Sequence, residues 1–148
     1  MKPYWCPFCR SSVSLIDSAK VYGCHYGFIY LCDSYPNCDA RVGYHPGSIK
    51  PLGTLADREL RRWRSLAHRK FDPLWQSGVF SSRQAAYKWL SKAMKLPLSR
   101  THVAMFDIRQ CQRACSVIES FTKGRQRVKT KSTTHCQGEL SCSTNQLP

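Results

Sequence analysis

Hydrophobic and polar residues follow two different periods along this chain. Short alternating or apolar runs between turn-forming residues predict β-strands over residues 12–16, 20–26, 27–32 and 40–44. From residue 56 onward the apolar residues recur at steps of three and four, which is typical of the buried face of a helix. The pattern therefore predicts an α+β chain, with a small β unit first and helices after it.

Three helices are expected in the second part of the chain. A segment rich in Pro and Gly, residues 45–53, is interpreted as a linker, and Thr54 as the N-cap of the first helix. Asp72-Pro73 disfavours continuation of that helix beyond Lys70. Ser81 and Asp107 each precede a Gln by three residues, which is a capping box and predicts the start of another helix.

The apolar periodicity ends near Phe121, and the residues after it are polar and basic. We therefore divide the chain into a β unit at residues 1–49, a three-helix unit at residues 50–121 and a disordered basic tail at residues 122–148.

Four cysteines in the β unit have the spacing of a metal site. They form a C-x2-C pair and a C-x5-C pair: Cys6, Cys9, Cys32 and Cys38. Four thiolates from two such loops can surround one Zn²⁺ tetrahedrally, which predicts a four-cysteine zinc ribbon. The alternatives are disulfides and coincidental free cysteines. The chain has nine cysteines, an odd number, and its first twenty residues lack the apolar stretch of a signal peptide, so we favour zinc and a cytoplasmic location.

Other cysteine and histidine residues leave two alternatives open. Cys24 or His25 could replace one of the four ligands, although an isolated thiol more often packs as a small hydrophobic residue. His102, Cys111 and Cys115 could form a second metal site, and the alternative is two buried helical cysteines.

The charge of the chain indicates an anionic partner. The net charge is +14, and residues 50–121 carry fourteen basic residues against five acidic ones. Four arginines crowd the first predicted helix and are expected to contact phosphates, the alternative being a solvated helix face: Arg58, Arg61, Arg62 and Arg64. Aromatic residues of the ribbon either form its small core or stack on unpaired bases, and three are expected to be exposed for stacking: Tyr22, Tyr30 and Tyr44.

The second cysteine loop, with Tyr35-Pro36 inside C-x5-C, resembles the C-terminal zinc ribbons of bacterial type IA DNA topoisomerases. That resemblance implies contact with single-stranded DNA. Arg10 stands where those ribbons usually have Gly after the first pair, which predicts a different turn in the first loop.

A longer resemblance covers roughly residues 4–121. It includes Pro51-Leu52-Gly53-Thr54-Leu55-Ala56 and Phe71-Asp72-Pro73-Leu74-Trp75, and it is to a family of small zinc-finger-containing proteins found mainly in phages and prophages. It implies the four zinc ligands and the cytoplasm of a bacterial host, and it supplies no substrate.

Together these features predict a zinc protein that binds nucleic acid, with single-stranded or unwound DNA favoured. The alternative is an interaction module that binds and modulates a host enzyme. A site closed by four cysteines has no open coordination position, so we expect no enzyme activity and no small-molecule substrate. No stretch has the length and apolarity of a membrane span, so no membrane partner is expected.

Overall fold

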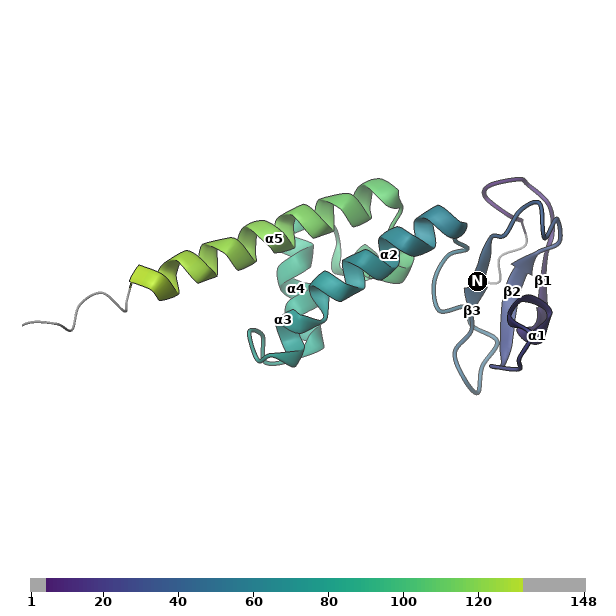
Figure 1. The fold of residues 1–148 in the computed structure, drawn as a ribbon, viewed down its shortest axis with the longest axis horizontal. Helices are drawn as coiled ribbons and strands as arrows, with labels where there is room; N and C mark the ends of the chain where they lie inside the picture. Colours follow the sequence, from purple (N-terminus) through teal and green to yellow (C-terminus); the bar gives the residue numbers. More distant parts are fainter. Residues whose placement is uncertain (1–4, 132–148) are drawn as a thin grey trace, which may run out of the picture.

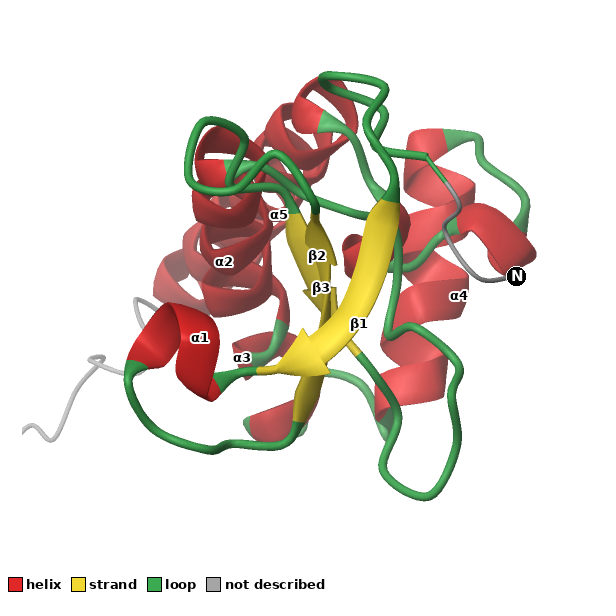
Figure 2. Cartoon of the chain, turned by 90° about the vertical axis from the view of Figure 1, so that its right-hand side faces the viewer, coloured by secondary structure: helices red, strands yellow, loops and turns green. Residues whose placement is uncertain are grey.

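The computed structural model describes residues 5–131 of the chain, and the side chains of residues 5–125. A small β-sheet lies at one end of the molecule and the helices extend away from it (Figure 1). Seen from the sheet end, the strands lie in front of the helices (Figure 2). The predicted α+β fold, a β unit followed by helices, is confirmed.

The sheet has three antiparallel strands in the order β1-β2-β3. They are β1 (Val13–Asp17), β2 (Phe28–Cys32) and β3 (Arg41–Gly43). β2 is central and pairs with both neighbours, with Tyr30 opposite Leu15 on one side and opposite Val42 on the other. Burial of four of the five residues of β2, against exposure on much of β1, follows from this central position.

A strand predicted over residues 20–26 does not form. The chain instead makes one helical turn, α1 (Ala19–Tyr22), which ends at Gly23 in the left-handed conformation with φ of 74°. The Asp17 carboxylate accepts a hydrogen bond from the N–H of Ala19 at 2.8 Å. This local turn chemistry directs the chain out of β1, so β1 becomes the partner of β2.

The second part of the chain contains four α-helices and two 3-10 turns among the described residues. They are α2 (Arg58–Phe71), α3 (Pro73–Gln76), α4 (Arg83–Met94), η1 (Leu98–Arg100), η2 (Val103–Met105) and α5 (Ile108–Lys131). α2 and α5 lie side by side, and α3 and α4 lie against them (Figure 1). Their core is closed by fully buried side chains that include Phe71, Leu90 and Phe106. No helix within residues 5–131 is both long and apolar enough to cross a membrane.

Of the three predicted helix starts, that of α5 is confirmed and those of α4 and α2 are displaced along the chain. The predicted box of α5 forms: Asp107 accepts from the N–H of Gln110 at 2.7 Å, and the Gln110 side chain accepts from the N–H of Asp107 at 3.0 Å. The N-cap of α4 is Ser82, one residue later than the predicted Ser81, and the Ser82 side chain accepts a hydrogen bond from the N–H of Ala85. The N-cap of α2 is Asp57, not Thr54.

The segment interpreted as a linker is folded onto the β unit. Ala56 pairs with Arg41 through two backbone hydrogen bonds of 3.0 and 3.1 Å, and Tyr44 forms a bridge with Pro51. Leu55, only 3% exposed, belongs to the small core beside the cysteines. The bridge to Arg41 keeps Ala56 outside a helix, which is why the N-cap of α2 lies three residues later than predicted.

α5 continues beyond the predicted end of ordered structure. We expected disorder from residue 122, but the helix runs to Lys131. Thr122 donates a hydrogen bond to the carbonyl of Ile118 at 2.8 Å, and Arg125 lies over the Phe121 ring. Extending a formed helix adds one hydrogen bond per residue without a new nucleus, so loss of apolar periodicity does not end it. The rest of the predicted tail, residues 132–148, lies outside the described residues.

Candidate functional site

The first cysteine loop is a tight turn between Trp5 and β1. The Cys6 carbonyl accepts from the N–H of Arg10 at 2.9 Å, and the Cys6 N–H donates to Ser11 at 2.8 Å. Arg10 itself has φ of 65°, the left-handed region that glycine usually fills. Arg10 thus adopts the conformation that favours glycine, at a cost of about 1 kcal/mol, and the prediction that arginine would avoid this conformation is wrong.

The second cysteine loop comes directly after the central strand. β2 delivers Cys32, whose carbonyl accepts from the N–H of Tyr35 at 3.1 Å, and the loop returns through a cis Tyr35–Pro36 bond to Cys38. The hydroxyl groups of Ser11 and Ser34, 2.6 Å apart, join the two loops. The two loops are thus joined by a hydrogen bond that does not involve the sulfurs.

The four predicted cysteines meet in one cluster. Their Sγ atoms all lie within 4.8 Å of one another, with 3.6 Å between Cys6 and Cys38 and 3.2 Å between Cys9 and Cys32. A disulfide would bring two sulfurs to about 2.05 Å, and all four thiols are free. Tetrahedral zinc with Zn–S bonds of about 2.3 Å separates its sulfurs by about 3.8 Å. The donor set therefore fits one Zn²⁺, and the disulfide alternative is wrong for these residues.

The surroundings of the thiols make zinc binding a proton-coupled event. Burial raises the pKa of the Cys32 thiol, and burial also raises the pKa of Cys38. Hydrogen bonds from Ser11 lower the pKa of Cys9, which is at the exposed side of the cluster. Because zinc binds thiolates, the metal displaces these protons, and its binding free energy contributes directly to folding of the ribbon.

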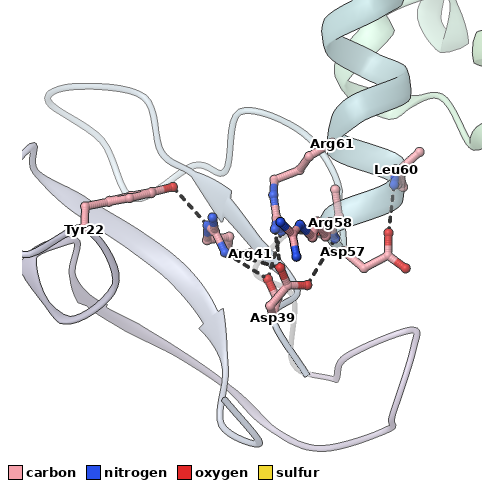
Figure 3. Close-up of polar contacts among 8 residues, drawn as sticks. Tyr22, Asp39, Arg41, Asp57, Arg58, Leu60 and Arg61 are labelled. Atoms are coloured by element: carbon pink, nitrogen blue, oxygen red, sulfur yellow. Dashed lines mark hydrogen bonds and ion pairs between the residues drawn. The ribbon is translucent and has the colours of Figure 1, made fainter. Parts of the chain in front are cut away.

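Asp39, the residue after the ligand Cys38, connects the cysteine cluster to α2 (Figure 3). Its carboxylate accepts from the backbone N–H of Arg58 at 3.1 Å and forms an ion pair with Arg61. The Arg61 guanidinium also donates to the carbonyls of Asp39 and Ala56 at 2.8 and 2.6 Å. Burial opposes ionisation of Asp39, but the hydrogen bond and charge of Arg61 outweigh it and lower the pKa of that carboxyl.

A basic groove of 970 Å³ lies between the second cysteine loop and α2. Five arginines line it, against two aspartates: Arg41, Arg58, Arg61, Arg62 and Arg69, with Asp39 and Asp72. Tyr35 and Pro36 of the cysteine loop form part of its wall, and His68 also lines it. Arg58, Arg62 and Arg69 are exposed, whereas Arg41 and Arg61 are half-buried and bonded to Asp39.

Three of the four predicted phosphate-contacting arginines meet in this groove, and Arg64 does not. Arg64 is 9% exposed, and its guanidinium donates to the carbonyl of Phe106 at 2.9 and 3.0 Å and to the carbonyl of Thr54 at 2.8 Å. It joins the start of α5 to the segment before α2. Arg64 is therefore a structural residue whose donors are already used, and the prediction of an outward-facing side chain was wrong because its partners are distant in the sequence.

The three predicted stacking tyrosines have three different environments. Tyr30 is 3% exposed and donates its hydroxyl to the Ile49 carbonyl at 2.6 Å, so it belongs to the ribbon core and the prediction that it is exposed is wrong. Tyr44 is half-buried against Phe28. Tyr22 is exposed, accepts a hydrogen bond from Arg41 at 2.9 Å and lies under its guanidinium.

Sequence reasoning did not select three residues of the groove as site residues: Tyr35, Arg41 and Arg69. Arg69 was counted only among the basic residues of the first helix, and Tyr35 was used only as part of a motif. Their position is set by the approach of the cysteine loop to α2, which Asp39 fixes. In the sequence, the nearest indication of this contact was Asp39, the acidic residue directly after the last of the four zinc ligands.

A model of a protein family, described as a zinc-finger-containing domain, matches residues 2–121 of the chain. The chain belongs to this family. Comparison with curated proteins and with solved structures gives no match. The family description and the four-cysteine geometry agree, and this zinc-finger-containing domain binds one zinc ion.

The other candidate ligands do not join a metal site in the described part of the domain. There the four cysteines are the only group of three or more metal-binding side chains that converge. Cys111 and Cys115 are buried in the helical core, and His102 stacks on the ring of Tyr87. Cys24 is exposed, and His25 is paired with Asp17 at 2.6 Å. The alternatives of a second site and of a substitute ligand are therefore not supported.

Proposed function

We propose that this domain binds single-stranded nucleic acid, with DNA favoured, in the basic groove between the zinc ribbon and α2. The observation that carries the proposal is the composition of that groove, which is lined by four arginines of α2, by Arg41 of β3 and by Tyr35 of the second cysteine loop. Arginine is the side chain best suited to phosphate because its planar fork donates two parallel hydrogen bonds.

The distribution of charge and aromatic rings supports a single strand. Arg58, Arg62 and Arg69 are exposed on α2, where they can follow a sugar-phosphate backbone. On the ribbon side, Tyr35 lines the groove and Tyr22 lies beside Arg41 at its edge. Bases that are not paired have free faces for such rings, and each base stacked on an aromatic side chain contributes about 1–3 kcal/mol.

Zinc has a structural part in this proposal. Four cysteines leave no open coordination position, so the ion positions the second loop rather than activating water. Asp39, at the end of that loop, is hydrogen-bonded to Arg58 and Arg61 and so holds the loop against α2. We accordingly propose a binding protein and not an enzyme. The resemblance to phage and prophage proteins extends the proposal to an accessory role in the cytoplasm of a bacterial host.

Fluorescence anisotropy with a labelled 20-nucleotide single strand tests the proposal. The variant Arg58→Ala/Arg62→Ala/Arg69→Ala removes three exposed groove charges and should weaken binding to DNA of any sequence. The slope of log affinity against log salt concentration should fall by about 2, near 0.7 for each lost phosphate contact on a single strand. Duplex DNA and single-stranded RNA of the same sequence, used as competitors, establish which class of nucleic acid is preferred.

A matched control removes three charges elsewhere. Lys88, Lys92 and Arg113 are exposed on α4 and α5 and do not line the groove. Replacing these three by Ala makes the same change in net charge and should flatten the salt slope much less. Equal losses in the two triple variants would show that only overall charge matters, and the groove would lose its role.

A further inference from the structure

A second and larger groove, of 1150 Å³, lies between the first cysteine loop and the start of α5, and it shares no lining residue with the basic groove. Its lining is mainly apolar, and four of the large apolar side chains in it are exposed: Trp5, Phe8, Leu52 and Met105. Trp5 is 71% exposed. Large apolar side chains gathered in one concave site are unusual on a protein surface and mark a place where another molecule is bound.

The walls of this apolar groove are fixed by close packing and by hydrogen bonds. Gly53 lies so close to Ala104 that an added Cβ would stand 2.2 Å from the Ala104 carbonyl oxygen. The N–H of Thr54 donates to the same oxygen at 3.2 Å. Arg64 also joins the two walls, since its guanidinium bonds to Thr54 on one side and to Phe106 on the other. The groove is therefore preformed, which reduces the entropic cost of binding.

The charges around the groove are mainly positive. Lys50 and Arg109 line it and are exposed, as is His45. Asp107 is the one acidic residue of the lining, and its carboxylate already caps α5 by accepting from Gln110. A bound molecule with apolar residues on one side and carboxylates beside them would match both the apolar lining of the groove and the basic residues around it.

We propose that this groove docks an acidic amphipathic segment of a partner protein. An amphipathic helix places apolar residues on one face at steps of three and four, the usual pattern for insertion into a hydrophobic groove. A second copy of the chain fits less well, because two molecules of net charge +14 repel each other. Nucleic acid also fits less well, because apolar side chains predominate where a strand would need phosphate contacts.

Fluorescence anisotropy with three labelled 18-residue peptides tests the proposal on the full chain with zinc bound. All three carry Leu and Phe on one helical face, and the polar face carries Glu, Gln or Lys. The Glu peptide should bind saturably and about tenfold more tightly than the Lys peptide. Met105→Glu places a carboxylate in the groove and should weaken binding of the Glu peptide at least about tenfold.

Leu98→Glu is the matched control, because Leu98 is exposed to a similar extent, 45% against 48% for Met105, and does not line the groove. It should bind the Glu peptide like the parent chain. Leu52→Glu is a second groove variant and should repeat the loss, and zinc content and circular dichroism confirm that each variant is folded.

Three results would overturn the proposal. The first is equal affinity for the Glu and Lys peptides, or an unchanged affinity for the Glu peptide in both Met105→Glu and Leu52→Glu. The second is a concentration-dependent dimer that Met105→Glu dissociates, since the groove would then be an interface between copies. The third is displacement of the Glu peptide from the groove by a 20-nucleotide single strand.

Discussion

Replacing Arg64 by Ala should destabilise the domain strongly, although the neighbouring Arg62 should be dispensable for stability. Arg64 makes two buried bonds to the carbonyl of Phe106 and further bonds to the carbonyl and hydroxyl of Thr54 at 2.8 and 2.6 Å. Phe106 is fully buried, so loss of a charged donor leaves its carbonyl unsatisfied, which costs about 1.5–3 kcal/mol. Thr54 is exposed and can be hydrated, so loss of the hydrogen bonds from Arg64 to Thr54 adds only about 0.5 kcal/mol.

These contributions give a loss of about 2–3.5 kcal/mol in the free energy of unfolding for Arg64→Ala. With a dependence on urea of about 2 kcal/mol per M, in the middle of the usual range for small proteins, the unfolding midpoint should fall by about 1–2 M. Circular dichroism during urea titration in excess zinc measures this midpoint. Arg62→Ala should change stability by less than about 0.5 kcal/mol, as is usual for an exposed helical side chain.

Arg64→Lys separates the structural role of Arg64 from a role in binding. One ammonium group cannot reach both Phe106 and Thr54, so stability should lie between those of the parent chain and of Arg64→Ala. Affinity for a single strand should remain that of the parent chain, because the donors of Arg64 point into the protein. Equal urea midpoints for Arg64→Ala and Arg62→Ala would refute the structural role assigned to Arg64.

Cys6→Ser should abolish binding of the one zinc ion expected per chain and unfold the ribbon. Elemental analysis of protein prepared without chelator measures the zinc content, and an unchanged content would contradict the site. Ending the chain after Phe121 removes residues 122–148, and the side chains described among them, those of residues 122–125, are exposed, so the melting temperature should change by only a few degrees in calorimetry. His102 is exposed on one side and stacked on the Tyr87 ring on the other; this partial desolvation, and then the charge of Arg83, lower the pKa of His102. The unfolded chain therefore binds a proton at this residue more readily, so stability should decrease as the pH falls through about 6.5. His102→Gln should show a smaller decrease between pH 7.5 and pH 5.5 in urea titrations, and an identical decrease would exclude His102 as its source.

Features that depend on neighbouring residues could be predicted from the sequence. The spacing of the four cysteines located the metal site, because each pair forms its own short loop. The capping box of Asp107 and Gln110 located the start of α5, because both hydrogen bonds span only three residues. Asp72-Pro73 located the end of α2 to within one residue, because proline restricts the residue directly before it.

Features that depend on distant partners could not be predicted. Arg64 and Tyr30 are matched with carbonyls 42 and 19 residues away, and neither partner can be identified from a helical or alternating pattern. Thr54 is a good N-cap residue, but the pairing of Ala56 with Arg41 keeps it outside the helix. The basic groove likewise exists only because the second cysteine loop approaches α2, so its arginines could be recognised as charges but not as a site.

The ion pair between Asp39 and Arg61 has a consequence for how the family can diverge. Each of the two residues satisfies the other, and Asp39 also accepts from the backbone of Arg58. Loss of either one alone leaves a half-buried charge at the junction of ribbon and helix. Positions 39 and 61 should therefore change together during evolution, and relatives that lack the acid after the last cysteine should also lack the arginine.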